Sequence, residues 1–262
     1  MTGDDGRSPT GDDGRSPTGD DGRSPTGDDG RSPTGKPAAV LFDFSGTLFR
    51  FTERAEWFTE LHDEDGAPID GHLQAELIRR MTAPTGVPAE LDDEMRAAWL
   101  RRDLDPALHR ASYLAVLRAS GLAVPGHAES LYERVLAAES WDAYPDTVSA
   151  LTLLAERSIA IGIVSNIAFD LRAVFARHGV DHLVDVWALS HEVGITKPDA
   201  GIFRFATDHL DVDPSRTLMI GDSEEADGGA RGIGCSFALV EPLPVPDRPR
   251  ALLDALSAAH IA

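Results

Sequence analysis

Val40-Leu41-Phe42-Asp43-Phe44-Ser45-Gly46-Thr47-Leu48 is the stretch of sequence on which the predicted fold depends. The apolar residues 38–42 predict a strand buried on both faces, as in a parallel sheet. Asp43 follows that strand directly, at the edge where open α/β sheets bind their ligands. Glycine at position 46 would let the Gly46–Thr47 turn present main-chain N–H groups to an anion beside this carboxylate. Because an aspartate after a strand often only forms a turn, the rest of the chain must decide between these interpretations.

Composition restricts the possible partners of the chain. Its 262 residues are 42% hydrophobic and 26% charged, which is typical of a globular protein. The formal net charge of −20 argues against nucleic acid or an anionic membrane, since both require a basic surface. The sequence shows neither a membrane span nor a signal-peptide apolar region, so we expect a cytoplasmic protein. The single cysteine, Cys235, excludes an internal disulfide and predicts a buried, unreactive thiol.

The N-terminal segment is a repeat. Residues 2–33 are four copies of the octamer TGDDGRSP. A segment with no apolar side chain and many glycines, prolines and aspartates cannot bury a core. We therefore predict that residues 1–36 form a disordered tail, to which the sequence assigns no task.

Two patterns divide the rest of the chain. Between residues 51 and 140, apolar side chains recur every three or four positions, which predicts helices throughout, with the clearest segments at 73–81, 91–100, 107–122 and 128–138. Strands at 159–164, 183–189, 217–220 and 236–240 then alternate with helices at 146–157, 169–178, 198–209, 224–232 and 252–259, with Pro198 in the first helical position of its helix. This alternation predicts an α/β fold, a doubly wound parallel sheet with helices on both faces. We predict a core formed by residues 37–50 and 142–262, with a helical domain, residues 51–141, inserted after the first strand.

Polar side chains follow several predicted strands. Ser165 and Asp222 stand at strand ends, Lys197 lies after the third core strand, and Asp227 is about one helical turn beyond Asp222. Such ends converge on one crevice with Asp43 in a doubly wound sheet. Aspartates are hard oxygen ligands suited to Mg²⁺, and a lysine with a hydroxyl would stabilise a transferring phosphoryl group. Lys197 is one of two lysines in a chain that otherwise uses arginine, as expected where a compact charge is required.

The inserted helices contain one polar cluster. His109 and Tyr113 are four residues apart and therefore share one helix face. They could pack between helices or face a substrate, and the sequence leaves both interpretations open.

Four stretches of the chain together resemble the haloacid dehalogenase-like hydrolases. They are LFDFSGTL at 41–48, IGIVSN at 161–166, TKPDAGIF at 196–203 and MIGDSEEADGGARGIG at 219–234. The inserted helical domain matches the C1-type cap of this family in its placement. The resemblance covers about residues 38–50 and 142–242, and it implies a Rossmann-like core.

The resemblance assigns roles to the strand-end residues. It implies that Asp43 is a nucleophile that forms an aspartyl-phosphate, which water then hydrolyses. Ser165 and the main chain of Asn166 would hold phosphate oxygens, and Lys197 would tie Asp43 to the phosphate. The implied reaction is the hydrolysis of a small phosphorylated metabolite.

The resemblance also implies a cofactor and a mode of substrate binding. Mg²⁺ would be bound by Asp43, the carbonyl oxygen of Ser45 and Asp222, with Asp227 farther out or on a bound water. The cap would close over the site and select the substrate. The residues expected to contact the substrate are Ser45, Gly46, Thr47, Asn166 and His109.

Ser45 is a departure from the family pattern. Phosphatases of the family usually have a second aspartate at this position, which acts as general acid and then base. A serine hydroxyl is too weak an acid for this step, which contributes about 10²–10⁴ in rate. Either the leaving group needs little protonation, or water or the cap supplies the proton, with His109 as the candidate.

Three other functions stay open at this point. Family members without an acid at this position include dehalogenases and a carbon–phosphorus bond hydrolase, so cleavage of a carbon–phosphorus or carbon–halogen bond is one alternative. The dehalogenases differ in the fourth stretch, where this chain keeps Asp222 and Asp227. A second alternative is a non-catalytic phosphate-binding or regulatory protein. A phospho-accepting receiver domain is disfavoured, because receivers lack a long helical insert.

Overall fold

The computed structural model of this chain describes residues 36–82, 88, 91–122 and 124–261. The predicted disordered tail, residues 1–36, thus lies outside the described residues except for Lys36. Within the described ranges, no helix combines the length and apolar character needed to cross a bilayer.

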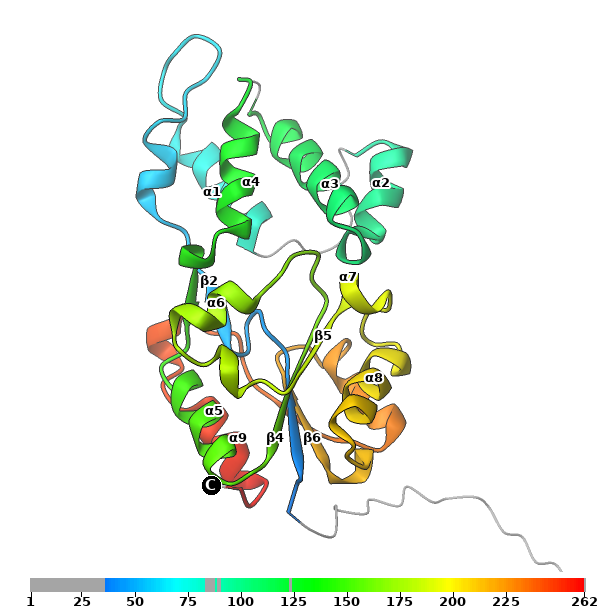
Figure 1. The fold of residues 1–262 in the computed structure, drawn as a ribbon. Helices are drawn as coiled ribbons and strands as arrows, with labels where there is room; N and C mark the ends of the chain where they lie inside the picture. The colour runs from blue at the N-terminus through cyan, green and yellow to red at the C-terminus, as the bar shows by residue number, and fades with distance from the viewer. Residues whose placement is uncertain (1–35, 83–87, 89–90, 123, 262) are drawn as a thin grey trace, which may run out of the picture. The chain divides into compact units, whose positions relative to one another are not determined.

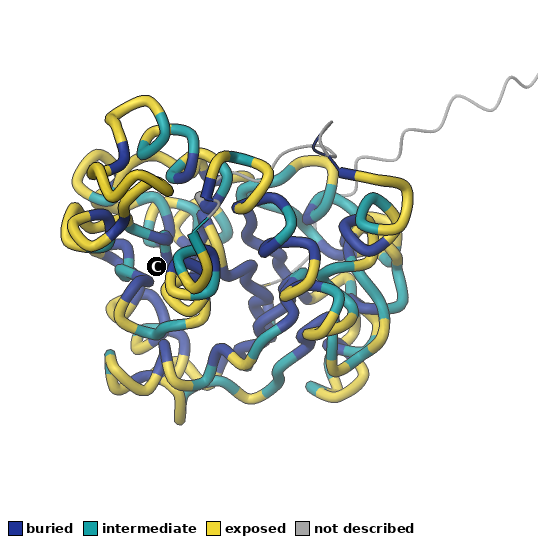
Figure 2. The backbone as a smooth tube through the Cα atoms, turned by 90° about the horizontal axis from the view of Figure 1, so that it is seen from above, coloured by how far each residue is buried: buried dark blue, intermediate teal, exposed yellow. Residues whose placement is uncertain are grey.

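Five parallel strands form the central sheet, in the order β5-β4-β1-β6-β7. They are β1 (Ala39–Phe42), β4 (Ala160–Ser165), β5 (Val186–Leu189), β6 (Thr217–Gly221) and β7 (Ser236–Leu239). The central strand β1 is completely buried and pairs with β4 on one side and β6 on the other. Figure 2 shows buried backbone in the interior and exposed backbone around it. The parallel sheet of the predicted doubly wound fold is confirmed.

Helices cover both faces of the sheet, as Figure 1 shows. One layer contains α5 (Thr147–Glu156), α6 (Arg172–Arg177) and α9 (Ala251–Ala258), and the other contains α7 (Ser190–Val193) and α8 (Ala200–Leu210). Alternate residues of β1 serve the two layers, because side chains of a strand point to opposite faces in turn. Val40 and Phe42 belong to the apolar cluster that includes Leu151 of α5, whereas Leu41 packs in a second cluster with Phe203 of α8.

In the part of the inserted domain that the structure describes there are four α-helices. They are α1 (Gly71–Thr82), α2 (Asp93–Leu100), α3 (Pro106–Ala119) and α4 (His127–Leu136), with 3₁₀ turns η1 (Ala55–Phe58) and η2 (Arg102–Leu104). The prediction of helices throughout 51–140 is wrong at the start of the insert, where Phe51 belongs to a strand. Strands β2 (Phe49–Phe51) and β3 (Trp141–Ala143) pair antiparallel and connect the cap to the core. Phe51 and Trp141 face each other across this strand pair, with ring centroids 5.4 Å apart. This cross-strand contact stabilises the two short segments as strands rather than as helices.

Another non-helical segment of the insert lies between η1 and α1. Here the chain turns around Asp63, whose side chain accepts the N–H groups of Asp65 and Ala67. An aspartate that bonds to the backbone two residues ahead favours a turn over a helix.

Several core elements differ from their predicted bounds. The remaining 3₁₀ turns are η3 (Ala138–Ser140), η4 (Asp181–Leu183), η5 (Pro214–Arg216), η6 (Asp227–Ile233) and η7 (Val245–Asp247). Pro198 is not the first helical residue of α8, because Asp199 caps that helix by accepting the N–H of Gly201 at 2.7 Å. The predicted helix 224–232 is η6, where Gly229 lies so close to Pro198 that a Cβ would be 2.7 Å from its carbonyl oxygen.

Candidate active site

Asp43 stands where the sequence places it, one residue beyond β1. Its N–H donates to the carbonyl oxygen of Ile220 at 3.0 Å, which extends the pairing with β6 and fixes the backbone. The side chain is nearly buried, and one carboxylate oxygen accepts a hydrogen bond from Lys197 Nζ at 2.5 Å. Ser165 ends the neighbouring strand β4 and is also buried. Asp43 and Ser165 thus lie at the carboxyl ends of the paired strands β1 and β4.

Lys197 links two carboxylates. Its Nζ lies 2.5 Å from Asp43 Oδ1 and 2.7 Å from Asp227 Oδ1. Asn166 holds the lysine backbone in two directions, donating to its carbonyl oxygen at 3.0 Å and accepting its N–H at 2.7 Å. Burial by itself lowers the pKa of Lys197, but the attraction of Asp43 and Asp227 outweighs it, so the pKa is raised. Lys197 is consequently a fixed positive charge.

Three carboxylates converge beside this lysine. Asp43, Asp222 and Asp227 each offer an oxygen, and these atoms all lie within 4.8 Å of one another. Asp227 uses one oxygen for Lys197, and the other accepts the N–H of Ser223 at 2.9 Å. Burial, followed by the charges of Asp43 and Asp227, raises the pKa of Asp222 to about 7, against the effect of Lys197. One lysine does not neutralise three carboxylates, and hard oxygen donors at this spacing fit a divalent cation such as Mg²⁺.

The loop at Gly46 and Thr47 differs from the expectation. The N–H of Gly46 donates to the carbonyl oxygen of Phe49 at 2.7 Å, so it is used within the loop rather than offered to an anion. Gly46 has a φ of +83°, and a Cβ there would overlap the carboxylate of Asp222. Thr47 is completely buried. The N–H of Gly46 is therefore used within the loop, and Gly46 makes room for Asp222; the expected substrate contacts of Gly46 and Thr47 stay predictions.

Arg248 supports this loop from the C-terminal segment. It donates to the carbonyl oxygen of Gly46 at 2.7 Å and to that of Thr47, and its guanidinium lies 3.2 Å from the ring centroid of Tyr144. Sequence reasoning missed Arg248, since nothing in the residues around it distinguishes it from the other arginines.

A cavity of about 280 Å³ lies between the loop that carries Ser45 and the cap. Ser45, Asn166, Ile167 and Phe169 line it from the core, and the other lining residues are Phe51, Met81, Arg102, Asp103, His109, Tyr113, Val135 and Trp141. Its wall is largely aromatic and apolar, with one arginine and one carboxylate. Of the residues expected to contact the substrate, Ser45, Asn166 and His109 are brought together here.

His109 is held in a buried aromatic cluster. Its Nδ1 lies 2.9 Å from the hydroxyl of Tyr132, and its ring stacks on Tyr113 with centroids 4.3 Å apart. Burial, assisted by the positive charge of Arg102, lowers the pKa of His109 to about 3. His109 thus packs between helices and also lines the cavity, while its contact with a substrate stays a prediction. The low pKa disfavours the role of proton donor, because a neutral imidazole is a very weak acid at neutral pH.

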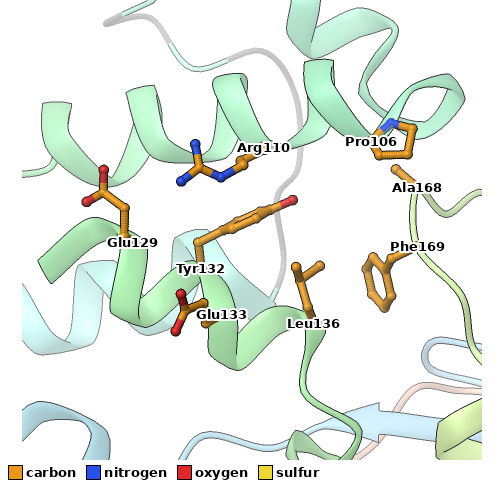
Figure 3. Close-up of a pocket in the computed structure, with 8 residues that line it drawn as sticks. All are labelled: Pro106, Arg110, Glu129, Tyr132, Glu133, Leu136, Ala168 and Phe169. Atoms are coloured by element: carbon orange, nitrogen blue, oxygen red, sulfur yellow. The ribbon is translucent and has the colours of Figure 1, made fainter. Parts of the chain in front are cut away.

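A second cavity, of about 340 Å³, lies on the other side of Tyr132 and Phe169. Figure 3 shows Tyr132 and Leu136 of α4 facing the core loop residues Ala168 and Phe169, with Arg110 above the tyrosine. Tyr132, which lines this second cavity, shares a hydrogen bond with His109, which lines the first.

Arg102 and Asp103 are further cavity residues that sequence reasoning missed. They lie in η2, and the hydroxyl of Ser190 in α7 donates to the carbonyl oxygen of Asp103, which ties this turn of the cap to the core. The sequence signal is only a charged pair before Pro106, and such pairs usually face solvent.

Comparisons with known proteins agree with this architecture. A family model described as haloacid dehalogenase-like hydrolase matches residues 37–232. The chain is 29% identical over 222 residues to a ribulose-1,5-bisphosphate 5-phosphatase of Halopiger xanaduensis, covering 78% of this chain and 84% of that protein. It is 30% identical over 213 residues to a phosphoserine phosphatase of Thermus thermophilus, covering 80% and 81%. The structure of the L-2-haloacid dehalogenase of Xanthobacter autotrophicus aligns with a TM-score of 0.56 at 22% identity over 86% of each chain, a likeness of fold.

Proposed function

The chain belongs to the haloacid dehalogenase-like hydrolase family, and from this premise we propose that it is a Mg²⁺-dependent phosphatase of a small phosphorylated metabolite. The observation that carries the proposal is the position of Lys197, which bridges Asp43 and Asp227 at 2.5 and 2.7 Å beside a third carboxylate. This arrangement combines a carboxylate nucleophile with a fixed positive charge in a nearly dry site.

Asp43 is the proposed nucleophile. Its carboxylate oxygen attacks phosphorus, the leaving oxygen departs, and water then hydrolyses the resulting aspartyl-phosphate. Lys197 holds the carboxylate in place and offsets the negative charge that gathers during transfer. Ser165, at the end of β4, is proposed to hold a phosphate oxygen together with the main chain of Asn166.

The carboxylates are the proposed Mg²⁺ site. Asp43, Asp222 and the carbonyl oxygen of Ser45 would hold the ion, with Asp227 farther out because both of its oxygens already accept hydrogen bonds. The ion would supply charge neutralisation around the phosphate oxygens. The high pKa of Asp222 supports this assignment, because a cation would relieve the repulsion among the three carboxylates.

Phosphorus chemistry is favoured over halide displacement. The carboxylate trio is suited to a cation that serves an anionic phosphate, and two relatives that align along most of the chain are named phosphatases. The cavity of about 280 Å³ suits the organic part of a small metabolite.

The proposal is tested with p-nitrophenyl phosphate, with and without Mg²⁺. We expect Mg²⁺-dependent release of nitrophenol and a loss of at least about 10⁴-fold in kcat/KM for Asp43→Asn. Glu94→Gln, an exposed change on α2, is the matched control and should retain activity. Full activity of Asp43→Asn, or halide release from 2-haloacids without any phosphatase activity, would contradict the assignment.

A further inference from the structure

Hydrolysis in the cavity between the Ser45 loop and the cap requires a proton donor, and Ser45 cannot be that donor. An alkoxide leaving group has to be protonated as it departs, and a serine hydroxyl at this position is far too weak an acid. Among the described residues that line the cavity, the titratable side chains are Arg102, Asp103, His109 and Tyr113. We therefore expect the proton donor to be one of these four groups.

Three of the four groups are unsuitable acids. Arg102 stays protonated in proteins and cannot give up a proton. His109 is neutral, because burial and Arg102 lower its pKa to about 3. Burial raises the pKa of Tyr113 above its usual value, which makes the phenol a still weaker acid. Asp103 has the only carboxyl group among the described residues of the cavity wall.

Asp103 is also held firmly in position. The hydroxyl of Ser190 donates to its carbonyl oxygen and accepts the N–H of Ile167 at 2.9 Å. One hydroxyl thus joins the cap turn to the segment that follows β4 and carries Asn166. This connection keeps Asp103 on the same cavity as Ser45, where the family pattern has its acid.

The charges around Asp103 leave it able to act as an acid. Burial raises the pKa of its carboxyl group, while Arg102, at 3.6 Å, and Lys197 act in the opposite direction. The packed helix α7 adds Glu192, which is bonded to Arg172, and His191, whose Nδ1 lies 2.9 Å from the carbonyl oxygen of Ile167. The carboxyl group is thus partly desolvated, and its pKa is raised above the usual value, which favours the protonated form.

We propose that Asp103, on the cap, is the general acid and base that replaces the missing aspartate at position 45. The proposal rests on the proposed phosphatase function and deepens it. In the first step Asp43 bonds to phosphorus, the bond from phosphorus to the leaving oxygen breaks, and that oxygen takes the proton of Asp103. The products are an alcohol, an aspartyl-phosphate and the Asp103 carboxylate.

The second step returns the proton. The Asp103 carboxylate accepts a proton from water as the water oxygen bonds to phosphorus, and the bond from phosphorus to Asp43 breaks. Inorganic phosphate leaves, and both aspartates regain their starting forms. Because the acid is on the cap, efficient turnover of poor leaving groups requires the cap turn to be docked on α7.

The test compares two leaving groups in Asp103→Asn. With n-propyl phosphate, a poor leaving group, kcat should fall by about 10²–10⁴, whereas p-nitrophenyl phosphate should lose much less in its first step, since nitrophenolate leaves without a proton. The transient release of nitrophenol in stopped flow isolates that step. Glu94→Gln should not change the turnover of either substrate. Equal losses on both substrates in the first step, or no loss on the alkyl phosphate, would overturn the assignment.

A rescue experiment separates a chemical role from a structural one. The double variant with Ser45→Asp and Asp103→Asn should hydrolyse the alkyl phosphate at least tenfold faster than Asp103→Asn alone, because Ser45→Asp supplies an acid at the family position. If Asp103→Asn does not fold by circular dichroism, Asp103→Glu replaces it and should show a smaller loss selective for the alkyl substrate. No selectivity in that variant would refute the proposal. Dependence of aryl phosphate turnover on Asp43 tests the phosphatase function separately, whichever result Asp103 gives.

Discussion

The strand-end cluster of the core and the aromatic cluster of the cap are both buried and both contain titratable side chains. The core cluster holds a charged lysine, whereas the cap cluster is neutral. Lys197 pairs with the carboxyl groups of Asp43 and Asp227 at 2.5 and 2.7 Å. His109 and Tyr132 are neutral groups that share a hydrogen bond at 2.9 Å. The pKa of Lys197 is raised, whereas that of His109 is lowered to about 3.

The difference shows that the partner, and not burial itself, decides the charge of a buried group. Burial disfavours the charged form in both clusters. In the core, two carboxylates close to the lysine outweigh this cost. In the cap, the nearby charge is Arg102, which repels a proton from His109 and adds to the effect of burial. A buried charge is thereby retained on Lys197 in the core, whereas the imidazole of His109 in the cap is neutral.

Removing the charge of Lys197 should give the largest effect. Lys197→Met leaves the buried carboxylates of Asp43 and Asp227 facing each other without a partner, which should cost about 3–5 kcal/mol of unfolding free energy. Urea unfolding of the metal-free protein measures this loss, and p-nitrophenyl phosphate turnover should fall to background. If the free energy of unfolding does not change, the ion pairs with Lys197 do not keep the carboxyl groups of Asp43 and Asp227 charged.

Gly46→Ala should give an intermediate effect by disturbing the core cluster sterically. The residue has a φ of +83°, and the new Cβ would be 2.8 Å from Asp222 Cγ, so we expect a loss of about 2–4 kcal/mol and weaker Mg²⁺ binding. Gly66→Ala is the matched control, because Gly66 has a φ of +81° with nothing within 4 Å of its Cβ. It should lose about 1–2 kcal/mol and bind Mg²⁺ normally in a thermal-shift titration. Equal effects of the two changes would argue against close packing on Asp222.

The pH dependence of the cap should give the smallest effect. His109 has a lower pKa in the folded protein than its usual 6.5, so the unfolded chain takes up the proton first as the pH falls. The stability it contributes is complete above pH 6.5 and is lost progressively towards pH 3. Between pH 6.5 and 5 the loss should be about 2 kcal/mol.

His109→Gln provides the comparison for this prediction, since glutamine does not titrate. The difference in urea-unfolding free energy between pH 6.5 and 5 should be about 2 kcal/mol smaller in the variant than in the unaltered protein. Equal pH dependence in both proteins would show that His109 takes up its proton without unfolding of the cap.

Much of the core site could be predicted because strand periodicity fixes where the residues after a strand lie. Asp43, Ser165 and Asp222 follow parallel neighbouring strands, so their meeting at one edge follows from the order of the sheet. The contact between Lys197 and Asp43 confirms the same argument for a loop residue. The role of the Gly46–Thr47 turn was not predictable, because it depends on the Phe49 carbonyl oxygen and on Arg248, about 200 positions away.

The sequence by itself determined the α/β core, the inserted helices and the strand-end cluster, because these follow from local periodicity and from residues adjacent to strands. Only the tertiary structure decided which cap residues face the cavity and in what charge state. The docking of Asp103 through Ser190 and the neutrality of His109 depend on contacts between distant segments. Desolvation and nearby charge are properties of three-dimensional surroundings, and no local pattern of residues encodes them.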